Sequence, residues 1–494
     1  MKKILSLLIA VIMIFTCISV SFAADEPKQT CPVISVPGFI ASDIYADMDD
    51  KNSLIGFPGT DEILSVVTEA FIPGLLAFAI DRDTDKLVVK VTSKINDMFA
   101  DWFNESSGDA KPGSGVILEM PDEVTTTSRL TFSYDWRNDP MKIADELHQY
   151  IEKVCALSGS DKVALACHSL GSNIALTYLT KYGNDRVSGI VFDSPACNGV
   201  AIIGHVLTGN VNLDADGIAL FIKSFIGESE YEALAESFID ILKSAGVFGL
   251  FTDFADVIIE ALAPAVYRET VAPLLGSFPT FWSMLPDDKV DEAKAFIFDN
   301  ILKSKDTTAL KTKIDNYNTV VRANRTSTLK AFNNAGNFAI LSRYSVQTIP
   351  LKGSAELLGD YMIETKASSF GAVTAPIGQH FSDEYLSQKD PAYISPDKTV
   401  DASTCLFPEQ TWFIKGSGHF ETGGVTTPYY DMFLFAEKEL TCDTAEIGRF
   451  TYRDAVTYTL VEDTTVPETM ENPSFIKSIY NFIMSVVTII CNLI

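Results

Sequence analysis

Ser169 stands in the segment Val163-Ala-Leu-Ala-Cys167-His168-Ser169-Leu170-Gly171, where an apolar run leads straight into a helical pattern. A strand that turns into a helix at a serine strains the serine backbone and exposes its hydroxyl. The amide that follows lies at a helix N-terminus, which favours negative charge. Glycine usually stands on both sides of such a serine, and here Cys167 replaces the first one. The pattern predicts that Ser169 is a nucleophile, against the alternative of a structural turn.

A serine nucleophile needs a base, for which the chain offers five histidines. His419 follows the apolar run 411–415 in the glycine-rich loop 416–420. In a parallel sheet with the nucleophile on an earlier strand, the base should follow the last strand. The other histidines are less suitable by their places in the chain. They lie beside the serine inside the turn, on a helix before it, at the start of the second helical region, and before the turn 395–403, at His168, His148, His205 and His380 respectively. We therefore predict His419 as the general base.

The base in turn needs a carboxylate that orients it. Asp397 lies in the turn 395–403, between a late strand and His419, and we predict it as this acid. Its alternative role is to stabilise a turn after proline. Asp401 and Asp463 are the rival acids, and Asp463 follows His419, which is the wrong chain order.

Two backbone N–H groups are expected to stabilise the charge that develops on a substrate oxygen. Leu170 directly follows the nucleophile and supplies the first. Phe39 follows the predicted strand 32–36 and the turn Pro37-Gly38, and supplies the second.

Short apolar runs alternate with helical stretches, which predicts an α/β fold with a mainly parallel sheet covered by helices. The predicted strands are 32–36, 130–134, 163–167, 187–192, 338–341 and 411–415, with a helix at 141–157. Two regions with helical patterns interrupt this order, at about 45–115 and 200–335. Because the strands on either side complete one sheet, we interpret both regions as insertions that cover it or cap it.

Four blocks, in this order, carry a resemblance to a known family: residues 32–39, Tyr134-Asp135-Trp136-Arg137, the turn at Ser169, and residues 397–403 before His419. Residues 277–286 resemble a family segment near the lid. The sequence resembles the lecithin:cholesterol acyltransferase-like, lipase-type branch of the α/β-hydrolases. Cys167, Lys398 and Asp401 depart from its pattern. The resemblance implies acyl transfer from lipid esters through an acyl-serine, without metal or cofactor.

The start of the chain indicates export. Residues 1–23 have two lysines, an apolar run and a small residue before a polar stretch, which predicts a secretory signal peptide and a secreted or cell-envelope protein. We assign residues 24–440 to the hydrolase domain and 441–494 to a C-terminal extension. The extension ends in an amphipathic helix at 475–494, which docks either on the body or on a membrane surface.

The composition excludes several classes of protein. A net charge of −27 over 494 residues repels a nucleic-acid backbone, so no nucleic-acid partner is expected. Five histidines and eight widely spaced cysteines fit neither a multinuclear metal site nor a disulfide scaffold, and most cysteines should be buried as small apolar residues.

The sequence thus predicts an exported serine esterase or acyltransferase that acts on lipid esters, with peripheral lipid contact. Two alternatives stay open. One is an esterase for soluble or wall-linked esters, and the other is a non-catalytic surface binding protein that keeps the fold.

Overall fold

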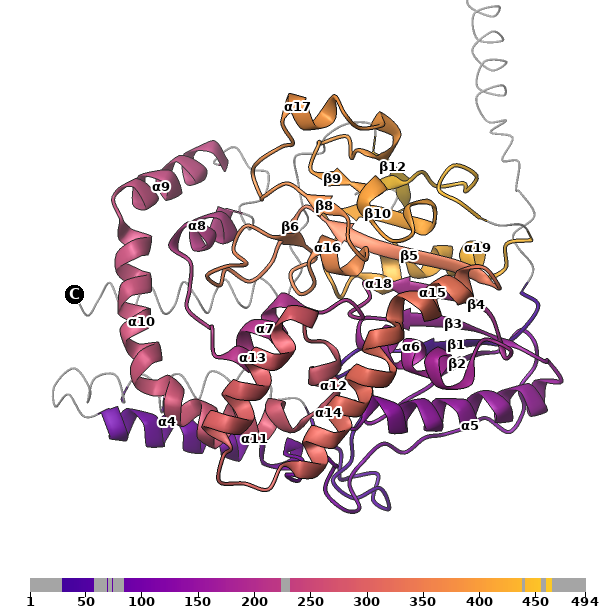
Figure 1. Ribbon diagram of the computed structural model, residues 1–494, viewed down its shortest axis with the longest axis horizontal. Coiled ribbons are helices and arrows are strands. Elements are labelled where there is room, and N and C mark those ends of the chain that lie inside the picture. Colours follow the sequence, from indigo (N-terminus) through magenta and orange to yellow (C-terminus); the bar gives the residue numbers. More distant parts are fainter. Residues whose placement is uncertain are drawn as a thin grey trace, which may run out of the picture.

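The computed structural model describes residues 29–56, 84–223, 232–437, 440–454 and 459–463, together with Glu69 and Pro73. An eight-stranded sheet in the order β12-β11-β10-β5-β4-β3-β1-β2 forms its centre (Figure 1). All neighbouring strands are parallel except β12, which runs antiparallel to β11. The sheet strands are β1 (Val33–Val36), β2 (Arg129–Thr131), β3 (Val163–His168), β4 (Val187–Asp193), β5 (Asn337–Tyr344), β10 (Thr411–Lys415), β11 (Phe450–Arg453) and β12 (Leu460–Glu462).

Helices cover both faces of this sheet, and the side chains of each strand alternate between the two faces. Leu165 and Cys167 of β3 belong to the larger apolar core, whereas Ala164 and Ala166 belong to a second core on the opposite face. The larger core includes buried residues of α5 (Pro140–Ser158), α6 (Leu170–Tyr182), α14 (Thr308–Val320) and α15 (Arg325–Asn333). The second core includes α19 (Tyr430–Leu434).

Local sequence explains the limits of α5, which the sequence predicted at 141–157. The Asp139 side chain accepts a hydrogen bond from the Met141 N–H, and Pro140 occupies the first helical position. Gly159 ends the helix in the left-handed conformation, with φ of 69°. Its apolar residues recur at helical spacing, and one face of the helix is therefore buried against the sheet.

The first insertion is closed at its base by a short backbone ladder. Tyr45 and Gly115 exchange backbone hydrogen bonds of 2.8 and 3.0 Å, close to the limits predicted from the sequence. Its helix α4 (Thr84–Met98) packs against α10 (Val247–Val266) of the second insertion. A buried ion pair of 2.8 Å joins Arg137 to Asp135, and Arg137 also donates to the Asp101 carbonyl at 3.2 Å. The hydrogen bond from Arg137 to Asp101 ties the insertion to the segment that follows β2.

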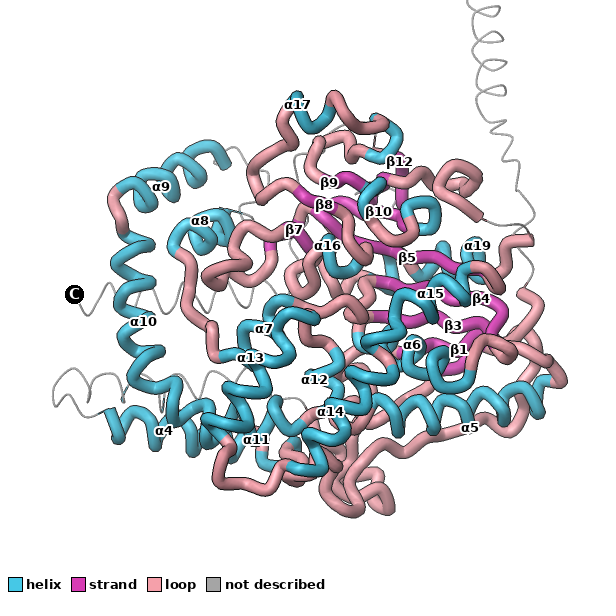
Figure 2. The backbone as a smooth tube through the Cα atoms, in the orientation of Figure 1, coloured by secondary structure: helices cyan, strands magenta, loops and turns pink. Residues whose placement is uncertain are grey.

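The second insertion connects β4 to β5 and, over its described residues, consists of helices and turns (Figure 2). In Figure 1 its helices α8, α9 and α10 stand at the left, outside the central sheet. The remaining helices of this insertion are α7 (Ala201–Thr208), α8 (Ala215–Lys223), α9 (Glu232–Ser244), α11 (Ala272–Leu274), α12 (Pro279–Ser283) and α13 (Val290–Lys294).

Between β5 and β10 the chain forms two small hairpins and two short helices, which the sequence did not predict. They are β6 (Val346–Gln347) with β7 (Leu358–Gly359), β8 (Val373–Thr374) with β9 (Val400–Asp401), α16 (Thr365–Ser368) and α17 (Asp383–Leu386). After β10, α18 (Thr422–Val425) leads to α19.

The predicted end of the hydrolase domain at residue 440 is wrong, because β11 and β12 extend the same sheet to Glu462. The predicted strand 130–134 is also shorter, since β2 ends at Thr131. The predicted signal peptide and the helix at 475–494 lie outside the described residues. Among the residues that are described, no helix is long and apolar enough to cross a bilayer.

The cysteines within the described ranges agree with their prediction as small buried residues. All six are unpaired and buried: Cys31, Cys155, Cys167, Cys197, Cys405 and Cys442.

Strand β1 and the start of α6 approach each other closely enough to require glycine at one position. A Cβ added to Gly171 would lie 2.0 Å from the Val36 carbonyl oxygen and 2.7 Å from that of Pro37. Both neighbours are backbone atoms, which cannot move aside without shifting the strand.

Replacing Gly171 by Ala should therefore lower the free energy of unfolding by about 3 kcal/mol or more. Gly56→Ala is the matched control, because Gly56 has open space around its Cβ position, and it should change stability by less than about 0.5 kcal/mol. Denaturant unfolding of both variants measures the difference. Equal stabilities would contradict the close approach of β1 and α6.

Candidate active site

Ser169 lies at the turn between β3 and α6, with φ of 52° and ψ of −123°. This conformation is sparsely populated for a residue with a side chain, and neighbouring contacts hold it in place. The Ser169 N–H donates to the Asp193 carbonyl at 3.1 Å, and the Ser172 hydroxyl donates to the Ser169 carbonyl. Cys167 fits where glycine is usual, because its side chain is fully buried in the larger core.

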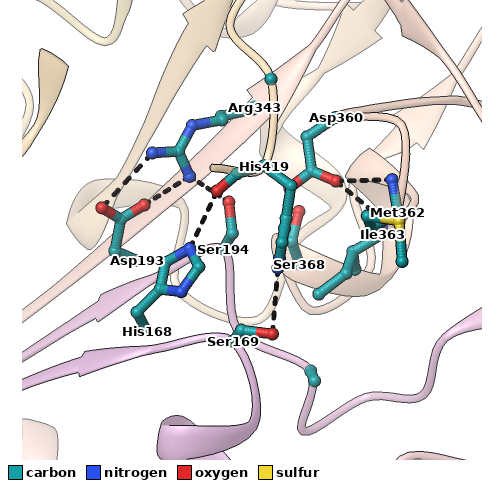
Figure 3. A network of polar contacts seen from close by, with 12 residues as sticks. His168, Ser169, Asp193, Ser194, Arg343, Asp360, Met362, Ile363, Ser368 and His419 are labelled. Carbon is teal, nitrogen blue, oxygen red and sulfur yellow. Dashed lines mark hydrogen bonds and ion pairs between the residues drawn. The ribbon is translucent and has the colours of Figure 1, made fainter. Parts of the chain in front are cut away.

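His419 contacts the Ser169 side chain. Its Nε2 lies 3.0 Å from the Ser169 hydroxyl, and its Nδ1 lies 2.8 Å from an Asp360 carboxylate oxygen (Figure 3). A carboxylate only accepts hydrogen bonds, so Nδ1 carries the proton of the neutral ring and Nε2 accepts from the serine. The structure thus aligns Ser169, His419 and Asp360 in the order of a serine catalytic triad.

Asp360 lies in a tight turn after β7. One of its carboxylate oxygens accepts hydrogen bonds from the backbone N–H groups of Met362 and Ile363, at 3.1 and 2.7 Å. Burial acts to raise the pKa of this carboxyl, but His419, Arg343 and the Ile363 N–H outweigh burial and lower it to about 2. Asp360 is therefore ionised at neutral pH and able to stabilise a protonated His419.

The prediction of Asp397 as the partner of His419 is wrong. Its carboxylate accepts from Lys415 at 2.9 Å and from Ser345 at 3.2 Å, and side-chain hydroxyls of Ser395 and Thr399 donate to its other oxygen. The Lys415 ammonium and these donors stabilise the charged form and lower the Asp397 pKa against the effect of burial. Asp397 therefore stabilises its own turn, which is the alternative role weighed for it.

The two rival acids also have partners away from His419. The Asp401 carboxylate accepts from Tyr385 at 2.7 Å and contacts Lys389, and the Asp463 carboxylate accepts from Tyr344 at 3.1 Å. Sequence reasoning passed over Asp360, although it too follows a late strand and precedes His419. The signal was the pair Gly359-Asp360 directly after the apolar pair Leu357-Leu358.

The backbone expected to supply the second oxyanion donor lies against the nucleophile. A Cβ added to Gly38 would lie 2.9 Å from the Ser169 Cβ. The Tyr134 hydroxyl donates to the Pro37 carbonyl at 2.6 Å, and the Phe39 ring packs on Trp136 with ring centres 4.4 Å apart. Both contacts orient this loop, and Leu170 opens α6 on the other side of Ser169. The roles of the Phe39 and Leu170 amides stay predictions.

The remaining histidines lie elsewhere or contact only the backbone of the site. His148 stacks on Tyr182, His205 contacts the Asn210 carbonyl and His380 contacts the Asp397 carbonyl. His168 contacts the His419 carbonyl. Within the described part of the chain, no three His, Cys, Asp or Glu side chains are grouped so as to hold a metal ion.

A family model for the alpha/beta hydrolase fold matches residues 124–235, which run from just before β2 into α9. The chain has the α/β-hydrolase fold. This fold agrees with the prediction from the sequence. The fold and the family match together support a hydrolase.

Two solved structures resemble parts of the chain. One is the crystal structure of the Tle4-Tli4 complex, with 16% identity, a TM-score of 0.21 and coverage of 36% of this chain. This chain spans about half of it (48%). The other is bromoperoxidase from Bacillus anthracis, with 15% identity, a TM-score of 0.15 and coverage of 38% of this chain and 82% of that one. No curated protein matches the sequence.

Exchanging Asp360 for Asn should keep the shape of the turn but remove the charge that stabilises protonated His419. We expect ester turnover to fall by roughly 10²–10⁴-fold. Asp397→Asn is the matched control and should change turnover by less than about threefold. Steady-state kinetics of both variants with a soluble ester decides between the two acids, and a larger loss in Asp397→Asn would contradict the observed geometry.

Glu364 lies four residues after Asp360 and is buried, with its carboxylate accepting from the Ala201 N–H at 3.1 Å. Burial raises its pKa from 4.5 to about 7. Between these two values the unfolded chain releases a proton that the folded chain keeps, so the free energy of unfolding falls as pH rises. The full effect is about 3 kcal/mol.

Glu364→Gln removes this titration while keeping an oxygen that can accept from Ala201. Relative to the wild type, the variant should gain stability between pH 4.5 and pH 8, by up to about 3 kcal/mol. Glu356→Gln, at an exposed position before the same turn, is the control and should show no such gain. Thermal unfolding at several pH values measures the stability of both variants against the wild type. A stability difference between Glu364→Gln and the wild type that does not change with pH would contradict the raised pKa of Glu364.

Proposed function

We propose that this protein is an exported serine hydrolase that cleaves carboxylic esters through an acyl-enzyme on Ser169. The observation that carries the proposal is the aligned contact from Ser169 through His419 to Asp360, at 3.0 and 2.8 Å. Export rests on the predicted signal peptide of residues 1–23.

In the acylation step, the Ser169 oxygen attacks the ester carbonyl carbon while its proton passes to His419 Nε2. The carbonyl oxygen becomes negative and accepts hydrogen bonds from the N–H groups of Phe39 and Leu170. The C–O bond of the ester then breaks, and His419 returns the proton to the leaving alcohol. Asp360 stays ionised throughout and stabilises the protonated His419.

In the second step, a water molecule or an acceptor alcohol attacks the acyl-serine with His419 again as the base. Water gives hydrolysis and an alcohol gives acyl transfer. The resemblance to the acyltransferase-like branch favours lipid esters as the acyl donor in both cases.

A lipid-like substrate is also favoured by apolar side chains exposed close to the triad. Phe420, next to His419, is 62% exposed, and Ile40, next to Phe39, is 39% exposed. The second insertion exposes further large apolar residues, at Ile241, Val247, Leu250 and Val257. Apolar surface of this kind suits contact with acyl chains, and we propose peripheral lipid contact on this basis.

Ser169→Ala should abolish labelling by a fluorophosphonate probe, because the probe bonds to the nucleophilic oxygen. Ester turnover should fall by about 10⁴-fold or more. Ser106→Ala is the control: Ser106 is an exposed serine that also stands two residues before a glycine, and its variant should still be labelled. Labelling of Ser169→Ala at the wild-type rate would contradict the proposal.

The substrate class follows from a series of esters of increasing acyl length, assayed below and above their aggregation thresholds. A lipid hydrolase should prefer long chains and gain activity on aggregates, whereas an esterase for soluble esters should prefer short chains. Adding an alcohol and measuring the products separates transfer from hydrolysis.

A further inference from the structure

His168 bridges the two loops that complete the site on either side of Ser169. Its Nε2 lies 3.0 Å from the carbonyl oxygen of His419 (Figure 3). Its Nδ1 would lie 3.2 Å from a Cβ added to Gly38, so the other edge of the ring faces the loop that carries Phe39. The ring centres of His168 and His419 are 4.7 Å apart.

The contact with His419 fixes the proton of the His168 ring. A carbonyl oxygen can only accept a hydrogen bond, so Nε2 must carry hydrogen and donate it. In the neutral ring, Nδ1 then carries no proton. Burial and the nearby His419 lower the pKa of His168 to about 3, which agrees with a neutral ring at neutral pH.

Neutrality matters because His419 becomes positively charged each time it accepts the serine proton. A second charged imidazole at this separation would repel that charge. The cationic side chain of Arg343 near His168 is itself matched by Asp193, in a fully buried ion pair of 2.6 Å. Thr426 and Tyr430 donate further hydrogen bonds to the Asp193 carboxylate.

The backbone of His419 is held on both sides. Its N–H donates to the Asp360 carbonyl at 2.9 Å, and its carbonyl accepts from His168. With both groups fixed, the ring is directed at Ser169 and at the Asp360 carboxylate together. If His168 could not donate, the His419 carbonyl would lose this hydrogen bond, and the hydrogen bond from the His419 N–H to the Asp360 carbonyl would remain.

We propose that His168 is a positioning residue: as a neutral donor to the His419 carbonyl, it holds the general base in line with Ser169. This inference rests on the proposed function and adds to it a residue that touches no reacting atom. A displacement of about 1 Å in such a base can lower the rate by roughly 10²-fold.

The test compares His168→Leu, which cannot donate, with His168→Gln, whose side-chain amide can reach the same carbonyl. We expect His168→Leu to lower kcat for a soluble ester by roughly 10- to 100-fold, with KM changed by less than about threefold. His168→Gln should recover to within about fivefold of the wild type. His380→Leu is the matched control, since His380 also contacts a backbone carbonyl but away from the triad, and it should retain wild-type kcat.

Titration with a fluorophosphonate separates positioning from a folding defect. A positioning role predicts that His168→Leu is labelled slowly but to full stoichiometry. If the Leu variant does not fold, His168→Asn replaces it, because Asn is smaller and too short to reach the His419 carbonyl. A wild-type kcat in the folded variant would overturn the inference. So would labelling of only a fraction of the molecules, if that fraction turned over at the wild-type rate.

The pH profile supplies an independent readout. If His168 stays neutral over the working pH range, the acidic limb of kcat/KM should persist in His168→Gln. Loss of that limb would show that His168 itself titrates and would overturn the inference.

Ser169→Ala distinguishes the failure of the inference from the failure of the proposed function. If Ser169→Ala is still labelled, the proposed function fails. If Ser169→Ala is inert but His168→Leu is fully active, only the role of His168 is refuted.

Discussion

The site depends on the close approach of three backbone segments around Ser169. Strand β3 must turn directly into α6, and Gly38 and Gly171 leave just enough room for the end of β1 to pass beside that turn. The strain at Ser169, with φ of 52°, is tolerated because β1 and β4 flank β3 and pair with it as far as Cys167 and His168. The same turn places the Ser169 hydroxyl at the carboxyl edge of the sheet, against His419. Every other catalytic group has to be brought to this edge.

The strand order brings them there. Parallel strands end at the same edge, so loops after β1, β3, β5 and β10 reach one region, although they are up to hundreds of residues apart in sequence. Phe39 follows β1, and His419 follows β10. Asp360 follows β5, but only after the β6–β7 hairpin, whose second strand ends at Gly359. The helical insertions lie between these strands in sequence and leave the order of the sheet intact.

Ser169 and His419 could be predicted because their signals are local: an apolar strand followed at once by a turn of small residues. The acid could not be chosen in this way, since 66 residues separate β5 from β10 and carry several carboxylates in turns. Asp397 has a more regular turn motif than Asp360, but its motif includes no sign that Lys415, on the next strand, neutralises it. Strands β11 and β12 were missed because short strands at or near the edge of a sheet have little apolar pattern. Their place depends on pairing with β10 and with each other.

The charges around His419 are arranged so that it alone changes protonation during the reaction. The carboxyl groups of Asp360 and Glu364 lie on one turn, yet their pKa values are pushed apart, to about 2 and about 7. Contact with His419 and the nearby charge of Arg343 stabilise the anion of Asp360, whereas burial favours the acid form of Glu364 despite the hydrogen bond from the Ala201 N–H. Arg343 is held by Asp193, whose carboxylate has enough donors to stay charged despite complete burial. One buried anion next to His419 and one balanced ion pair behind it leave the imidazolium as the only new charge that the proposed reaction places on these side chains, and Asp360 lies where that charge forms.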